Sequence, residues 1–189
     1  TVISFDFMYD FRWFEARENN EADHIIKADL AVSHAFSERL ELEVWDKFTY
    51  AQEGAVRVDT GVVVVPGRSD GDYFNNKAYG GVDIGVTERL VVGVSYLNDI
   101  WDYENSGLDS YSALLDRISH TPGIELGFIL QPTTIVGVGY KYNDTASRSS
   151  DLVTIAGAAV PGLPANTVTA DTRDYRSHSF YAGIEHQFN

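Results

Sequence analysis

Hydrophobic and polar residues alternate along most of this chain with a period of two. In the stretch from Ala78 to Asn98, apolar side chains occupy every second position of two runs, and mostly small or charged residues fill the positions between them. The two runs are joined by the short polar turn Thr87–Arg89. This pattern predicts a β-hairpin. Each apolar face extends over about nine residues, which is close to the length that a tilted strand needs to cross a bilayer.

Six further runs alternate in the same way and bring the predicted number of strands to eight. They cover Val2–Phe14, His24–Phe36, Leu40–Tyr50, Arg117–Gln131, Thr134–Asn143 and Tyr175–Phe188. Pro122 lies inside the fourth of these runs. Because proline has no backbone N–H to donate to a neighbouring strand, we expect a bulge or an unpaired extension there.

The connections between the runs alternate in length. Short turns separate longer connections; the turns are Ser37–Arg39, Thr87–Arg89 and Gln131–Thr133, and the longer connections begin near Glu15, Ala51, Asp99 and Asp144. We therefore predict an up-and-down antiparallel arrangement in which the short turns lie at one end of the strands and the long loops at the other. Both termini would then lie at the short-turn end.

Length, charge and composition exclude several classes of protein. The 189 residues suit one domain over positions 1–189. The chain has no run of eighteen apolar residues and no cysteine, so we expect neither a transmembrane helix nor a disulfide or thiolate metal site. Acidic residues outnumber basic ones by 28 to 14, and the formal net charge of −14 disfavours nucleic acid as a partner.

Alternation alone does not say which face of the sheet meets water. A soluble barrel of the lipocalin type would hold the apolar side chains inside, whereas a membrane barrel would turn them outward to lipid. Three features favour the membrane barrel: the polar face is rich in glycine, the loop lengths are asymmetric, and aromatic residues lie near both ends of the apolar face. The aromatic residues predicted to form interfacial girdles are Tyr9, Phe11, Trp13, Phe36, Phe48, Tyr50, Tyr96, Phe128, Tyr140, Tyr142, Phe180 and Phe188.

Three features of the chain occur together in one class of protein. They are the short turns SER, TER and QPT, the alternating strands between them, and the near-terminal phenylalanine of YAGIEHQFN. In these features the chain resembles a Gram-negative outer-membrane β-barrel. Its size and strand number are similar to those of small OmpA/OmpX-type barrels, and its hairpins are similar to parts of larger β-barrel porins. The resemblance implies an outer-membrane location, contact with outer-membrane lipid and lipopolysaccharide, and recognition of the last strand by the barrel-assembly machinery. It implies no particular chemistry.

Charged residues on the polar face are predicted to point into the lumen of such a barrel. Because an isolated buried charge is costly, these side chains must pair or reach water. They form either a polar network that fills the lumen or, since acidic members are in excess, the lining of a pathway that prefers cations. The predicted set is Asp6, Asp10, Arg12, Lys27, Asp29, Glu41, Glu43, Lys47, Asp83, Glu125, Lys141 and Glu185.

The long connections carry many carboxylates and two apolar segments. Oxygen ligands of this kind bind Ca²⁺ or bridge it to lipopolysaccharide phosphates, but no stretch matches an EF-hand, and solvated acidic loops are the simpler interpretation. We therefore expect no cofactor, with Ca²⁺ at the external loops as the alternative. The carboxylates are Glu15, Glu18, Glu21, Asp23, Asp70, Asp72, Asp99, Asp102, Glu104 and Asp109. The apolar segments Val62–Val65 and Val153–Val160 suggest a protein partner, a plug that folds back into the barrel, or an extension of the strands above the membrane. Of these, our hypothesis is contact with a protein partner at the loop end.

The histidines and serines do not predict an enzyme. His178 stands between two serines, but neighbours on a strand point to opposite faces, so Ser177–Ser179 does not form a catalytic triad. No P-loop or dinucleotide-binding motif is present. We predict an all-β fold, an up-and-down antiparallel eight-stranded transmembrane β-barrel, with a non-enzymatic structural or surface-interaction role through its long loops. The alternatives are a porin-like diffusion channel for small, preferably cationic solutes, and a soluble ligand-binding β-barrel.

Overall fold

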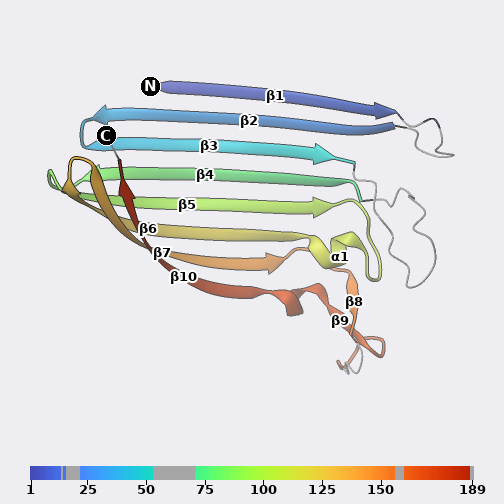
Figure 1. The fold of residues 1–189 in the computed structure, drawn as a ribbon. Helices are drawn as coiled ribbons and strands as arrows, with labels where there is room; N and C mark the ends of the chain where they lie inside the picture. The colour runs from blue at the N-terminus through green and yellow to red at the C-terminus, as the bar shows by residue number, and fades with distance from the viewer. Residues whose placement is uncertain (14, 16–21, 53–70, 156–159, 188–189) are drawn as a thin grey trace.

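The chain forms one large antiparallel sheet of eight strands (Figure 1). The structure is a computed structural model and describes residues 1–13, 15, 22–52, 71–155 and 160–187. The order of strands in the sheet is β1-β2-β3-β4-β5-β6-β7-β10, so that each strand pairs with the next strand of this sheet along the chain. The short strands β8 (Leu152–Thr154) and β9 (Thr167–Thr169), which lie between β7 and β10 in sequence, pair with each other in a separate sheet. The strands are β1 (Val2–Trp13), β2 (Ala22–Ser37), β3 (Leu40–Ala51), β4 (Tyr73–Gly85), β5 (Leu90–Tyr103), β6 (Arg117–Gln131), β7 (Thr134–Ser147) and β10 (Tyr175–His186).

The predicted all-β, up-and-down order of strands is confirmed. The three short turns lie together at one end of the sheet, and the longer connections lie at the other (Figure 1). The turns are tight because polar side chains hydrogen-bond to the backbone two residues on: Ser37 Oγ accepts from the amide of Arg39, and Thr87 Oγ1 accepts from the amide of Arg89, both at 3.2 Å.

Several strands extend farther toward the loop end than the alternation predicted. β4 begins at Tyr73, β5 continues to Tyr103 and β7 continues to Ser147, each reaching into a segment that we expected to be loop. The alternation fails there because polar residues such as Asn75 and Asn76 follow one another, although the pairing with β5 continues without interruption. The pattern of hydrophobicity therefore ends before the backbone pairing does.

The irregularity expected at Pro122 affects one side of β6 only. Pro122 pairs with Tyr96 of β5, whereas the pairing of β6 with β7 passes from His120 directly to Gly123. The proline therefore stands where one of the two ladders is interrupted, as its missing N–H requires.

The sheet is not closed, which differs from the closed barrel that we expected. β1 and β10 each have one neighbouring strand, β2 and β7 respectively, and form the two edges of the sheet. The physical reason for the difference is that alternation fixes which side chains share a face but contains no information about curvature.

Large apolar side chains on one face of the sheet are exposed rather than packed against a second layer. Phe5, Phe180 and Ile184 expose 65%, 79% and 70% of their surface. The buried hydrophobic residues of the described part of the chain are Ala51, Ala113, Val153, Val168 and Ala170. The sheet therefore holds its apolar face uncovered, and the small core lies among the loops.

Within the described residues, the helices are one-turn elements, and none of them has the length and apolarity that a membrane-spanning helix requires.

Candidate functional site

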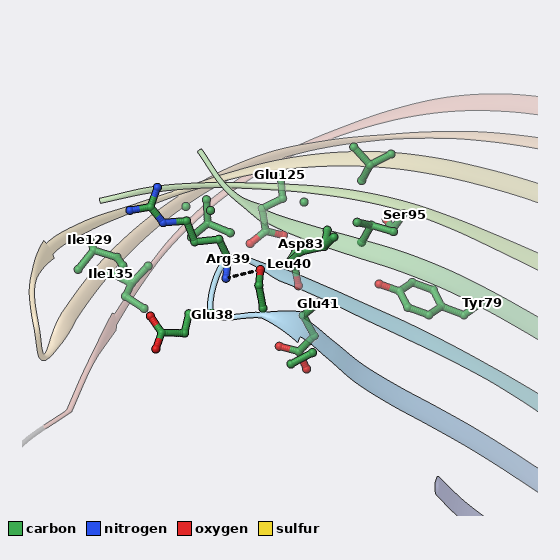
Figure 2. A pocket seen from close by; sticks show the side chains of 18 of the residues that line it. Glu38, Arg39, Leu40, Glu41, Tyr79, Asp83, Ser95, Glu125, Ile129 and Ile135 are labelled. Atoms are coloured by element: carbon green, nitrogen blue, oxygen red, sulfur yellow. Dashed lines mark hydrogen bonds between the residues drawn. The ribbon is translucent and has the colours of Figure 1, made fainter. Parts of the chain in front are cut away.

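The polar face of the sheet is hollowed at the short-turn end (Figure 2). The hollow has a volume of about 660 Å³ and is lined from Ala35 of β2 across the sheet to Tyr181 of β10. Because side chains from so many neighbouring strands line one cavity, the sheet curves around its polar face at this end.

Three carboxylates lie in one row across the floor of this hollow. The register pairs Glu41 of β3 with Asp83 of β4, then Asp83 with Gly93 of β5, and Gly93 with Glu125 of β6. The same row continues through Gly139 of β7 to Tyr181 of β10. Gly93 contributes no side chain of its own between Asp83 and Glu125, so this row presents acidic groups to the hollow.

Two tyrosines lie flat over glycines of the polar face. The ring of Tyr181 covers Gly139, where an added Cβ would run into it, and its hydroxyl group donates a hydrogen bond of 2.8 Å to Oε2 of Glu125. The ring of Tyr79 covers Gly81 and stacks on Trp45 with the ring centres 5.1 Å apart. Each glycine is therefore required by the close approach of an aromatic ring from the same face.

Positive charges lie on the polar face together with negative ones. Lys141 Nζ is 5.2 Å from the ring centre of Tyr181, beside the carboxylate row. Nearer the loops, Lys77 Nζ lies 3.7 Å from Asp99 Oδ2, and the guanidinium group of Arg117 lies 5.0 Å from the ring centre of Trp101. The residues that line the hollow therefore include both signs of charge with an excess of acidic groups, and mixed charges also lie toward the loops.

The register places the predicted charged set on one face, but it does not bring the set together at one site. Glu41, Asp83 and Glu125 share the row described above, and Glu43 and Lys141 lie in the next row. The other members lie elsewhere on the face, where Arg12 and Asp10 form an ion pair of 2.8 Å; they are Asp6, Asp10, Arg12, Lys27, Asp29, Lys47 and Glu185. Whether this face lines a lumen stays a prediction.

Alternation places Tyr79 and Tyr181 on the polar face, but the two tyrosines were not among the predicted site residues. Lys77 and Asp99 were not predicted on this face. A signal for the two tyrosines was present, because each aromatic residue has a glycine two positions along or directly opposite on the same face. No signal in the sequence identified the ion pair of Lys77 with Asp99, since both residues lay in segments with broken alternation.

The predicted girdle residues lie on the other, apolar face of the sheet. Aromatic contacts link them across strands: the ring centres of Phe48 and Phe74 are 5.3 Å apart, and those of Tyr140 and Phe180 are 4.9 Å apart. Phe188 lies outside the described residues. Their role at a membrane interface stays a prediction.

Two of the long connections fold together into a small structure at the loop end, which we call the cap (Figure 1). It contains the helix α1 (Tyr111–Leu115), the hairpin of β8 (Leu152–Thr154) with β9 (Thr167–Thr169), and the 3₁₀ turn η1 (Ala170–Arg173). Ala113, Val153 and Val168 form its core. The sequence did not predict these elements, because they are too short for a periodic pattern.

Hydrogen bonds to aspartates hold the cap together and shift their pKa values. Asp109 accepts bonds of 2.6 and 2.7 Å from the amide and hydroxyl groups of Thr154, and these bonds lower the pKa of Asp109. Burial raises the pKa of Asp116, although hydrogen bonds from Ser112 and from the amide of Tyr103 oppose this effect. The two connections are therefore joined by buried and charged groups rather than lying free.

The described residues contain no cluster of three or more histidine, aspartate or glutamate side chains that could hold a metal ion. His178 hydrogen-bonds to the hydroxyl group of Tyr140 on the apolar face, and Ser177 and Ser179 pair with residues of the polar face. The apolar segment Val62–Val65, Glu18, Glu21, Asp70 and part of Val153–Val160 lie outside the described residues.

No family model, curated protein or solved structure matches this chain.

Proposed function

We propose that this chain is part of the wall of an outer-membrane β-barrel, with its apolar face toward lipid and its polar face toward an aqueous lumen. The observation that carries the proposal is the exposed apolar face, which runs through all eight strands and which no other part of the described chain covers. In water such a surface would drive aggregation, whereas in a bilayer it meets hydrocarbon. The short turns at one end and long loops at the other support an outer membrane in particular.

The open edges of the sheet support a barrel that is closed by further pairing. In hydrocarbon an unpaired backbone N–H or C=O group costs several kcal/mol, so membrane sheets close on themselves. β1 and β10 each need one antiparallel neighbour, and they run in opposite directions. They are therefore able to pair with each other or with further strands.

A porin-like passage for small solutes, preferably cations, is the function that this geometry supports best. The polar side chains of the described sheet contact neighbours on the same wall, as Tyr181 does with Glu125, and they surround a hollow rather than a packed interior. The row of Glu41, Asp83 and Glu125 supplies the excess of negative charge that favours cations. No bond-forming or bond-breaking chemistry is part of this proposal.

Conductance across a planar bilayer tests the passage. We expect steady single-channel steps with a preference for cations, and we expect the double variant Asp83→Asn/Glu125→Gln to lower that preference. Asp46→Asn is the matched control, because Asp46 lies on the apolar face, where it bonds to Asn76. Folded protein that gives no steps would contradict the passage, and protein that stays soluble and monomeric without detergent would contradict the membrane barrel.

A second candidate function, recognition at the cell surface, is favoured by the cap. The cap is folded and exposes Leu108, Ile155 and Val160 by 61%, 44% and 41%, which is unusual for a loop that only joins strands. Deleting residues 152–170 tests this role: loss of partner recovery from a detergent extract supports it, and unchanged recovery contradicts it. Conductance steps that persist after the deletion separate this function from the passage.

A further inference from the structure

All five histidines of the chain lie on the apolar face, and each is hydrogen-bonded to a hydroxyl group of a neighbouring strand or of Thr1. Three of them form one repeated arrangement near the loop end of the apolar face. The pairs are Tyr9–His24, Tyr96–His120 and Tyr140–His178, with oxygen–nitrogen distances of 2.8, 2.5 and 2.8 Å and stacked rings whose centres lie 6.0, 6.1 and 6.0 Å apart.

The other two histidines lie near the short turns and pair with threonines instead. His34 Nδ1 is 2.5 Å from the hydroxyl oxygen of Thr1, and His186 Nδ1 is 2.8 Å from that of Thr134. The apolar face is therefore bounded at both ends by hydroxyl–histidine pairs, with tyrosine on the loop side and threonine on the turn side.

These boundaries do not follow the rows of paired residues; they cross the rows obliquely. The row that starts at His34, a boundary residue on the turn side, passes through Val94 and reaches Tyr140, a boundary residue on the loop side. A single row of paired residues therefore crosses the apolar face from the turn-side boundary in β2 to the loop-side boundary in β7.

The slope is similar along both boundaries. On the turn side, the row of His34 reaches Phe180 in β10, but the boundary histidine of β10 is His186, six residues nearer the turn end. On the loop side, the row of Tyr9 reaches Asp102 in β5, but the boundary tyrosine is Tyr96, again six residues nearer the turn end. From one strand to the next, the turn-side boundary shifts by one residue, since six residues are spread over the six steps from β2 to β10. The loop-side boundary shifts by 1.5 residues, since six residues are spread over the four steps from β1 to β5.

This slope has a direct geometric meaning. One residue advances about 3.3 Å along a strand and neighbouring strands lie about 4.8 Å apart, so a shift of about one to 1.5 residues per strand corresponds to strands tilted by roughly 35–46° from the direction perpendicular to the two boundaries. Strands of membrane barrels are tilted by about 35–45°. The length of the band also fits: it spans the positions from His24 to His34 in β2 and from His178 to His186 in β10, close to the roughly 9–11 residues that a tilted strand needs.

We infer that the two oblique lines of hydroxyl–histidine pairs lie at the levels of the lipid headgroups, and that the band between them is the surface that contacts hydrocarbon. The inference rests on the proposed membrane barrel and adds the depth of each residue. Tyrosine and histidine combine an apolar ring with a polar group, so their pairs suit a boundary between hydrocarbon and phosphate or glycerol oxygens. Beyond the loop-side line, the apolar face carries the ion pair of Arg176 with Asp144, at 3.2 Å, which belongs in the headgroup region.

Depth measurements on single-cysteine variants test the inference, because the chain has no cysteine of its own. The protein is reconstituted in phosphatidylcholine vesicles that contain lipids brominated at defined depths, and each cysteine carries a fluorescent label. Leu42, Val94 and Phe180 lie in one row of the register. We expect Val94 to be deepest, with Leu42 shallower by about 6 Å and Phe180 by about 9 Å on opposite sides of the bilayer centre, because they lie two and three strands from Val94.

Leu30, Val94 and Val138 form the matched comparison, because they lie in three different rows but at the same expected level, the middle of the band. Equal depth for these three positions supports the oblique band. Equal depth for Leu42, Val94 and Phe180 would overturn it, since the band would then follow the rows. Folding of each variant is verified by its heat-modifiable migration in detergent. The absence of quenching at every position would refute the membrane barrel itself.

Discussion

The hydroxyl group of Tyr181 in β10 donates a hydrogen bond to Glu125 in β6 across the whole width of β7. The contact is possible because β7 places Gly139 between them, and the tyrosine ring occupies the space that a side chain at this position would fill. A glycine in one strand therefore positions an aromatic ring from the next strand against a carboxylate in the third.

Replacing this glycine is expected to destabilise the sheet. Gly139→Ala forces the ring of Tyr181 to move and breaks its bond to Glu125, at a cost of about 1–3 kcal/mol in the free energy of unfolding. Gly183→Ala is the matched control on the same face, because nothing lies within 4 Å of an added Cβ there. Urea unfolding of the reconstituted protein measures both. If Gly139→Ala lowers the free energy of unfolding by as much in a Tyr181→Ala background as in the native protein, the clash between the added Cβ and the ring of Tyr181 is not the cause.

A second prediction concerns Asp46 and Asn76, which are hydrogen-bonded to each other on the apolar face. Nδ2 of Asn76 lies 3.0 and 3.1 Å from the two carboxylate oxygens of Asp46. Asn76→Leu leaves the carboxylate without this donor in hydrocarbon, and we expect a loss of about 1–3 kcal/mol or more. The double variant Asp46→Leu/Asn76→Leu removes both polar groups and should recover the native stability or exceed it. A double variant as unstable as the single one would place this pair outside hydrocarbon.

The cap is expected to loosen in acid because of Asp109. Its pKa is lowered in the folded cap by the two bonds from Thr154, so these bonds stabilise the cap above the pKa of the unfolded chain, about 3.9. The stabilisation is lost as the pH falls through the lowered pKa. Burial raises the pKa of Asp116, which acts in the opposite sense and favours the cap at low pH.

Protection of the Thr154 amide against hydrogen exchange, followed from pH 7 downward, measures this effect. We expect the protection of this amide to decrease when the pH falls below the range in which an aspartate ordinarily titrates. We expect Asp109→Asn to abolish this decrease, which forms a step in the pH profile. A step of the same size and midpoint in Asp109→Asn would show that another group is responsible.

The sequence predicts the order of the strands and the membership of their faces because both follow from alternation. It predicts Val92, Val94 and Tyr96 on one face of β5 and Gly93 and Ser95 on the other, and the register agrees. It does not predict where pairing ends, because residues such as Asn98 and Asp99 interrupt the pattern while the backbone continues to pair.

Features that depend on neighbouring strands could not be predicted from one strand at a time. The pairing of Tyr96 with His120, or of Tyr140 with His178, needs the register between two strands, which alternation alone fixes only to within steps of two. The open edges at β1 and β10 depend on curvature, and the cap depends on tertiary contacts between two connections.

The account depends most on which face of the sheet meets lipid, and two adjacent residues of β10 test this directly. Ile184 lies on the apolar face and is 70% exposed, and Glu185 lies on the polar face. The measurement is the free energy of folding into lipid vesicles for Ile184→Arg and Glu185→Arg. The account predicts a loss of about 1–3 kcal/mol for arginine at position 184, which lies between the bilayer midplane and the boundary at His186, and a much smaller change at position 185. Equal tolerance of both substitutions, or a larger loss at position 185, would contradict it.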